Sequence, residues 1–361
     1  MKHIHIAGER HQYCAWPAVT RTPDGTILVS YCRSEEHLGP DGEIQVVRST
    51  DEGESWSSPI VVRDSLIDDR EGGITRLSDG RILIHIWSTF HTPEMLKGLS
   101  PESYRSDVLE HWSKHTATLE YRSAAAEHGS RIYQSEDNGL TWKDTGKGPD
   151  SIHGGIELAS GKILVAGYRT SAPNIALHMA DPEELAWELV TLFKPPTLPD
   201  RRFGEPHIVQ LPSGRVVMML RSTAIPYADK SDANFLWVTW SDDEGRTWSD
   251  ARRTDLLGFP PHLCCLADGR ILCSYGRRFS PYGERACISD DGITWDVRRE
   301  QILRDDADGV DLGYPASLEM KPGKILTLYY QSPHTDPPAA MNPPDPLRRK
   351  PDILGTIWEL D

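Results

Sequence analysis

The sequence predicts an all-β protein, a six-bladed β-propeller of four-stranded blades with a small helical insertion in the second blade. Two interleaved repeats and a turn-rich composition lead to this prediction. Of the 361 residues, 38% are hydrophobic, and 29 Gly and 27 Pro residues favour many turns. This composition suits short strands joined by tight turns. Because propellers are long for single domains, we expect residues 1–361 to form one domain.

The first repeat is a turn motif that reads Ser-x-Asp-x-Gly-x-(Ser/Thr)-Trp. Complete copies start at Ser49, Ser135 and Ser241, and a copy that is one residue shorter starts at Ser289. In such a hairpin turn the Asp bonds to its own backbone, the Gly adopts a positive φ and the Trp packs beneath the turn. A Ca²⁺ loop is the alternative, but the D-x-[DN]-x-[DN]-G pattern is absent. A structural turn is therefore expected.

The second repeat is an apolar strand, a turn around Gly and another apolar strand. It occurs six times, with turn glycines at Gly25, Gly80, Gly161, Gly214, Gly269 and Gly323. These two strands and the two that flank the first motif make one blade, and six copies make six blades. The last apolar segment, Ile353–Leu360, is expected to close the ring with the N-terminal residues, which removes exposed sheet edges.

The phase of the repeats places the Gly turns and the Asp motifs on one face of the ring. The starts of the innermost strands, the ends of the second strands and the starts of the third strands then lie on the opposite face. The residues brought there are Arg33, Asp41, Asp69, Arg70, Glu71, His153, Arg169, Glu205, His207, Arg221, His262, Arg277, Arg278, Arg285 and Tyr314. Structural ion pairs explain any one of these residues, whereas the set as a whole indicates a binding site. The three histidines come from different blades without ligand spacing, so we expect no metal and no other cofactor.

Residues 90–130 interrupt the repeat in the second blade. Ser100, Pro101 and Glu102 have the residue types of a helix start, and Tyr104, Val108, Leu109 and Trp112 then fall on one helical face. The insertion belongs on the site face. Two roles are therefore possible for the insertion. It could form a lid or a wall of the site, or it could pack against blade 2 or contact another subunit. Residues 333–351 are Pro-rich and are expected to form an extended loop.

The composition limits which binding partners and which cellular compartment we expect. A net charge of −15 argues against nucleic acid, and no apolar run is long enough for a membrane helix. The six cysteines form no CxxC pair, so free thiols and a reducing compartment are expected. The first residues contain no apolar signal-peptide region, which favours a cytoplasmic location, although a trimmed secreted form stays open. Nothing in the sequence indicates an oligomeric state.

The turn motifs are Asp boxes and resemble those of the sialidase superfamily. The stretch from Gly204 to Gly214 and on to Arg221 resembles the sialidase segment that carries the catalytic Glu and the second Arg of the substrate-binding triad. The stretch from Leu312 to Tyr330 resembles the segment with the catalytic Tyr. Arg285 resembles the third triad Arg, and Asp41 is the nearest match to the acid/base Asp of the family.

The resemblance implies that Tyr314 is a nucleophile and Glu205 its general base. A phenol needs such a base because its pKa is near ~10. A neutral nucleophile also avoids repulsion by a substrate carboxylate, and sialidases are a known exception to the paired-carboxylate scheme. Arg221 and Arg285 would hold the substrate acid with their forked donors.

One departure from the family concerns the first triad Arg. Sialidases have Arg-Ile-Pro at the first innermost strand, where this chain has Ala15-Trp16-Pro17. Either Arg70 replaces that Arg from the next blade, or the substrate is another sugar on which Trp16 stacks. The sequence therefore predicts a glycoside hydrolase acting on a sialic acid or another, acidic sugar. A non-catalytic carbohydrate-binding propeller and a polysaccharide lyase that uses Tyr314 with a His or Glu are the alternatives.

Overall fold

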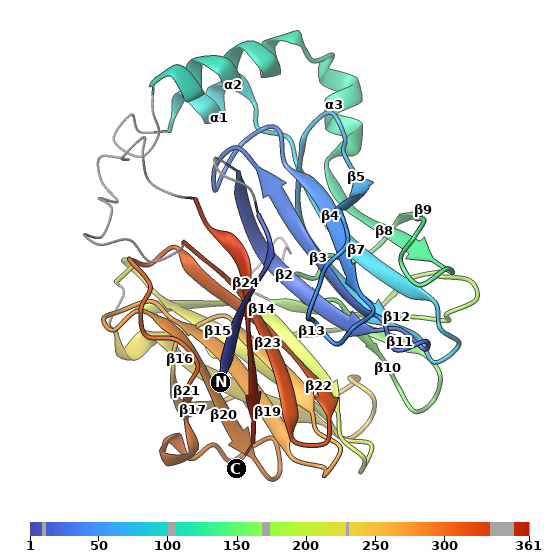
Figure 1. Ribbon diagram of the computed structural model, residues 1–361, viewed down its shortest axis with the longest axis vertical. Coiled ribbons are helices and arrows are strands. Elements are labelled where there is room, and N and C mark those ends of the chain that lie inside the picture. Colours follow the sequence, from blue (N-terminus) through green and yellow to red (C-terminus); the bar gives the residue numbers. More distant parts are fainter. Residues whose placement is uncertain (9–11, 100–105, 168–173, 229–230, 333–349, 361) are drawn as a thin grey trace.

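The computed structural model describes residues 1–361 except 9–11, 100–105, 168–173, 229–230, 333–349 and 361. It contains six four-stranded antiparallel sheets, which confirms the predicted six blades (Figure 1). Residues expected at the site or in the Pro-rich loop that fall in the gaps, Arg169 and 333–349, lie outside the described residues. No described helix is long and apolar enough to cross a membrane.

In the first three blades the strands follow one another along the chain from the innermost to the outermost position. Blade 1 contains β2 (Tyr13–Arg21), β3 (Ile27–Ser34), β4 (Glu43–Ser49) and β5 (Ile60–Arg63). Blade 2 contains β6 (Asp68–Arg76), β7 (Ile82–Thr89), β8 (Gly129–Ser135) and β9 (Lys143–Lys147). Blade 3 contains β10 (Gly155–Glu157), β11 (Ile163–Gly167), β12 (Ile175–Ala180) and β13 (Glu188–Phe193).

The other three blades also run from the centre outward, and the last of them takes its outermost strand from the N-terminus. Blade 4 contains β14 (Arg201–Gln210), β15 (Val216–Ala224), β16 (Phe235–Ser241) and β17 (Arg252–Leu257). Blade 5 contains β18 (Pro261–Cys265), β19 (Ile271–Arg277), β20 (Gly283–Ser289) and β21 (Gln301–Ile302). Blade 6 contains β22 (Leu312–Lys321), β23 (Lys324–Gln331), β24 (Asp352–Glu359) and β1 (Lys2–Ala7). Two short 3₁₀ turns, η1 (Asp232–Asn234) and η2 (Val297–Arg299), complete the elements outside the insertion.

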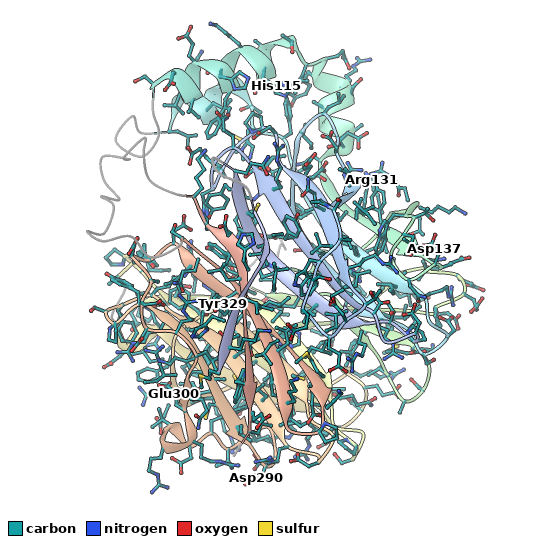
Figure 2. The ribbon with its side chains drawn as sticks, viewed as in Figure 1. His115, Arg131, Asp137, Asp290, Glu300 and Tyr329 are labelled. Carbon is teal, nitrogen blue, oxygen red and sulfur yellow. The ribbon has the colours of Figure 1, made fainter. Side chains whose placement is uncertain are left out.

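The N-terminal strand closes the ring, as predicted. Strand β1 pairs antiparallel with β24, with Lys2 opposite Ile357, and Figure 1 shows the dark blue strand beside the deep red one. Apolar side chains fill the spaces between neighbouring blades; one buried cluster joins blades 4 and 5 through residues such as Val217 and Leu263. Figure 2 places Tyr329 among these crowded side chains and Asp290 at the margin of the molecule. All six cysteines are free, which confirms the sequence prediction.

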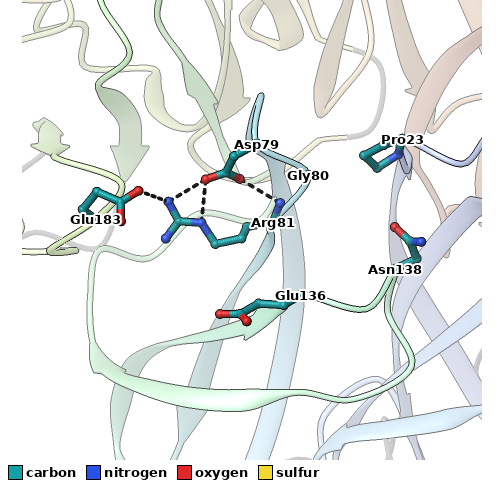
Figure 3. Close-up of a pocket in the computed structure, with 7 residues that line it drawn as sticks. All are labelled: Pro23, Asp79, Gly80, Arg81, Glu136, Asn138 and Glu183. Atoms are coloured by element: carbon teal, nitrogen blue, oxygen red, sulfur yellow. Dashed lines mark hydrogen bonds and ion pairs between the residues drawn. The ribbon is translucent and has the colours of Figure 1, made fainter.

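The Asp boxes are structural turns. Asp137 accepts hydrogen bonds from the Ser135 hydroxyl at 2.8 Å and from the Thr141 amide at 2.8 Å, so its carboxylate serves its own turn. Asn138 of the same box donates to Asp24 in a Gly turn at 2.9 Å. Asp boxes and Gly turns therefore share one face, as the repeat phase predicts. The pocket in Figure 3 lies on this face, lined by both kinds of turn, and is remote from the starts of the innermost strands.

The insertion in blade 2 is helical. It contains α1 (Pro93–Lys97), α2 (Ser106–Thr118) and α3 (Tyr121–Glu127), whereas the expected helix start at 100–102 and Tyr104 lie outside the described residues. Val108 and Trp112 are buried together with Leu96, as the helical periodicity predicts. The Trp112 indole donates to the Glu35 carboxylate at 3.0 Å. The insertion thus packs on the loop between β3 and β4 of blade 1.

Candidate active site

A β-bulge recurs near the start of the innermost strand in four blades. Trp16, Glu71, Glu205 and Tyr314 have φ values of 54°, 54°, 42° and 48°, in the left-handed region. The strand register shifts at each of these positions. Non-glycine residues seldom adopt this conformation, and such strain concentrates at functional sites. A bulge re-aims the side chain that it carries.

The sequence supports this geometry locally. Pro follows Trp16, Glu205 and Tyr314, and Gly follows Glu71. Proline has no backbone N–H, so it leaves no ladder donor unpaired at the bulge.

Tyr314, Glu205 and Arg221 form one hydrogen-bonded group. The Tyr314 hydroxyl donates to Glu205 Oε1 at 3.1 Å. One guanidinium nitrogen of Arg221 donates to Glu205 Oε2 at 2.6 Å and to the Tyr314 hydroxyl at 3.2 Å. Its Nε atom donates to the Thr223 hydroxyl at 3.0 Å. The structure thus joins residues from blades 4 and 6 that the sequence analysis assigned to one site.

Burial controls the electrostatics of this group. Tyr314 is only 8% exposed. Its burial and the nearby Glu205 carboxylate raise the pKa of the phenol, while Arg221 and Arg278 act in the opposite direction. Burial disfavours the charged form of Arg221, but Glu205 and Tyr314 together outweigh this effect and raise the pKa of the guanidinium. A neutral phenol beside a carboxylate–guanidinium pair is the resting arrangement.

Arg278 is the second cation at Tyr314. Its guanidinium carbon lies 5.6 Å from the Tyr314 ring centroid and 5.3 Å from that of Phe259. It donates to the Leu312 carbonyl at 3.0 Å and to the Tyr330 hydroxyl at 3.3 Å. The sequence analysis placed Arg278 on this face without giving it a role. No motif distinguishes it from its neighbour Arg277, which the sequence places on the same face.

Trp16 lies in the stretch that lacks the triad Arg, and Arg70 covers its ring. The Arg70 guanidinium carbon lies 4.3 Å from the Trp16 ring centroid, and Trp16 is 2% exposed. The Trp16 ring meets the Tyr314 ring edge to face at 6.4 Å. Arg70 also donates to Asp68 at 3.1 Å. Arg70 is therefore one ring away from Tyr314, and one face of Trp16 is already occupied.

Three other expected binding residues use their charges in contacts away from Tyr314. Arg285, 2% exposed, donates to the carbonyl oxygens of Glu284 and Arg304 and lies 3.7 Å from the Glu300 carboxylate. Asp69 accepts from Arg63 at 2.6 Å, and Arg33 lies 3.7 Å from Glu43. None of these contacts involves Tyr314, Glu205 or Arg221.

Two expected carboxylates occupy different surroundings. Glu71 is buried, and its charge raises the pKa of both Arg70 and Tyr314. Asp41 accepts from the Glu35 amide at 3.4 Å, and burial, followed by the charges of Glu35 and Asp68, raises its pKa. Asp41 thus belongs to the loop that the insertion supports.

The three histidines form a cluster of their own. The rings of His207 and His262 lie 4.2 Å apart between centroids, and His153 lies 4.9 Å from His207. His207 Nδ1 accepts from the Leu263 amide at 3.0 Å. Burial lowers the pKa of all three side chains, that of His262 to about 3, so they are neutral. Within the described ranges no group of three or more His, Cys, Asp or Glu side chains is arranged to hold a metal ion.

Sequence reasoning missed a second polar group beside Tyr314. Asp311 accepts from the Tyr13 hydroxyl at 2.8 Å and from the Tyr330 hydroxyl at 3.2 Å. His37 Nδ1 lies 2.6 Å from the Tyr13 hydroxyl. None of these residues belongs to a repeat motif. The only available signal was that Tyr13, Asp311 and Tyr330 lie at strand ends on the site face.

Comparison with known proteins agrees with this architecture. Residues 108–327, more than half of the chain, match the model of the BNR repeat-like domain. The chain belongs to this family. No curated protein matches this BNR repeat-like chain in sequence.

Three solved structures share the fold of this BNR repeat-like chain. A protein of unknown function from Dyadobacter fermentans has 22% identity and a TM-score of 0.75, with 99% of this chain and 98% of that chain covered. The NanB sialidase of Streptococcus pneumoniae, as the K499G mutant, has 12% identity and a TM-score of 0.61 over 96% and 68%. The α-L-arabinanase of Penicillium chrysogenum has 14% identity and a TM-score of 0.62 over 99% and 98%. The comparisons thus confirm the expected BNR-repeat family and the propeller fold.

Proposed function

We propose that this protein is a retaining glycoside hydrolase in which Tyr314 is the nucleophile and Glu205 its general base. The contact that carries the proposal is the 3.1 Å hydrogen bond from the Tyr314 hydroxyl to Glu205. It has the length required of a proton transfer between nucleophile and base. The bulged backbone of both residues supports a site in which strain is retained for function.

The electrostatics give each residue a distinct task. Because burial and Glu205 raise the pKa of Tyr314, the phenol attacks only as its proton moves to Glu205. Arg221 contacts both partners and keeps Glu205 oriented while negative charge moves to the phenolic oxygen. Arg278, beside the Tyr314 ring, adds a second positive charge. A preorganised site of this kind stabilises the charge that develops in the transition state.

The same cations favour an acidic sugar as substrate. Arg221 and Arg278 flank Tyr314, and Arg70 lies behind Trp16. Arginine donors match the fork of a carboxylate, and a neutral nucleophile avoids repulsion by it. Arg278 takes the part that the sequence resemblance gave to Arg285. The sialidase and arabinanase names of two similar structures support the broader class, enzymes that act on glycosides.

A panel of aryl glycosides, including sialic and uronic acids, tests the proposal. Release of a reducing sugar with retained anomeric configuration is expected, and it should disappear in Tyr314→Phe. An unsaturated product absorbing in the ultraviolet would instead identify a lyase. Saturable binding without any product would identify a carbohydrate-binding propeller. Either of these two results would refute the hydrolase assignment.

A further inference from the structure

A second functional group in the site comes from the loop 35–42, between β3 and β4 of blade 1. The loop is fixed from two sides. The Trp112 indole of the insertion holds Glu35 at 3.0 Å, and a Cβ added to Gly39 would lie 3.2 Å from the Trp112 ring. From blade 2, Arg70 donates to the carbonyl of His37 at 2.8 Å. The position of His37 is therefore set by contacts on both sides of the loop.

The His37 ring is oriented by a tyrosine and a carboxylate. Nδ1 lies 2.6 Å from the Tyr13 hydroxyl and 3.3 Å from Asp311 Oδ1. The Tyr13 hydroxyl proton is committed to Asp311 at 2.8 Å. The Tyr13 oxygen must then accept, so Nδ1 carries a proton and donates it. Proton exchange is left to Nε2, the other ring nitrogen.

His37 also lies where a leaving group could reach it. Its ring contacts Trp16 edge to face at 5.3 Å, and Trp16 contacts the Tyr314 ring. The His37 side chain is 46% exposed, whereas Tyr314 is 8% exposed. In the described part of the chain no residue hydrogen-bonds to Nε2. His37 thus combines access to solvent with a fixed ring beside the aromatic wall around the nucleophile.

The other candidates for this role are less suited to it. Asp41, the acid/base residue suggested by the family resemblance, has its described hydrogen bond to the Glu35 amide. His153, His207 and His262 are held neutral by burial and therefore lack the acidic imidazolium form that a general acid needs. His37 is a titratable side chain of the loop that is oriented by hydrogen bonds and 46% exposed, and the Asp41→Asn variant below distinguishes it from Asp41.

We propose that His37 is the general acid and base for the leaving group, with Tyr13 and Asp311 as its positioning residues. The assignment rests on the proposed glycoside hydrolase function. In the first step Tyr314 attacks the anomeric carbon and its proton passes to Glu205. The bond from that carbon to the leaving oxygen breaks, and this oxygen takes the Nε2 proton of the His37 imidazolium.

The second step restores every group. Neutral His37 takes a proton from a water molecule as the water oxygen attacks the anomeric carbon. The bond from that carbon to Tyr314 breaks, and the phenolate recovers its proton from Glu205. The net reaction is hydrolysis with two displacements, so the anomeric configuration is retained.

The test compares leaving groups of different acidity in wild type and His37→Ala. With an alkyl aglycone, which needs a proton, kcat/KM should fall by about 10²–10⁴. A 4-nitrophenyl aglycone leaves as a stable anion and needs no proton. With this aglycone kcat/KM should therefore fall less than about tenfold. Added azide should restore turnover of the variant and yield a glycosyl azide. His111→Ala is the matched control, because His111 is another exposed histidine, 3.4 Å from Glu35 of the same loop.

Asp311→Asn supplies a readout that a purely structural role would not change. Loss of the carboxylate charge removes support for the imidazolium, so the alkaline limb of the pH profile should move to lower pH. Equal losses on both aglycones in His37→Ala, or aglycone-dependent losses in Asp41→Asn instead, would overturn the assignment while leaving the hydrolase intact. Absence of hydrolysis by the wild type would refute the proposed function and this assignment together.

Discussion

Replacement of Glu205 by Gln tests the chemistry of the nucleophile most directly. At pH 7 a phenol of pKa ~10 is ionised in about one molecule in 10³, and the raised pKa of Tyr314 makes this fraction smaller. Without a base, attack depends on that fraction, so the rate of glycosyl transfer to Tyr314 should fall at least about 10³-fold. Tyr314→Phe should lose at least as much. The double variant should lose little more, because the pair acts as one unit.

Pre-steady-state release of 4-nitrophenol measures this step without interference from later ones. Tyr329→Phe is the matched control, since it removes another buried tyrosyl hydroxyl, 2.8 Å from Thr356 and outside the site. Thermal unfolding should be followed for every variant, because Glu205→Gln also removes the 2.6 Å ion pair of Arg221. Full activity of Tyr314→Phe, or additive losses in the double variant, would refute the paired mechanism.

Three further predictions concern specificity, folding and pH. Arg278→Met should raise KM for anionic sugars about 10- to 100-fold and KM for neutral sugars much less, because a hydrogen bond to a charged group contributes about 1.5–3 kcal/mol. Equal changes in KM for the two kinds of sugar would contradict the proposed contact between Arg278 and the substrate. Asp137→Ala (Figure 2) should lower the free energy of unfolding by about 1–2 kcal/mol in urea melts with kcat unchanged, because only turn hydrogen bonds are lost. Burial lowers the pKa of His262 to about 3, so the unfolded chain binds more protons and stability falls as the pH drops below about 6.5. Between pH 6.5 and 5 this loss is at most about 2 kcal/mol, and a His262→Gln variant with undiminished pH dependence would argue against it.

The repeats made the architecture predictable because each copy contains the residues that form its own turn. Asp137 and Gly80 fix the phase of their hairpins locally, and the phase fixes the face on which every strand begins. Glu205 and Tyr314 could therefore be placed together although 109 residues separate them. Their contact follows from the order of the blades, which the local repeats alone predict.

The residues around Tyr314 were harder to predict from the sequence, because they depend on the direction in which each side chain points. Arg285 pairs across the strand with Tyr275 and its guanidinium is used within blade 5, whereas Arg278 just beyond β19 lies against Tyr314. No repeat phase distinguishes these two outcomes. The loop that carries His37 is held at Glu35 by an indole of an inserted helix, and no motif connects that helix to the loop.

The pairing of β1 with β24 also constrains how the ring assembles. Lys2 can pair with Ile357 only after all the residues between them have been synthesised, so β1 must wait for β24. Contacts of such high sequence separation slow folding. Blades 1 to 5 are each built from consecutive strands and can form one after another during translation, whereas blade 6 needs both β1 and β24. A circular permutant that joins β24 to β1 through a short linker and opens the chain between two other blades would make this last blade a local hairpin.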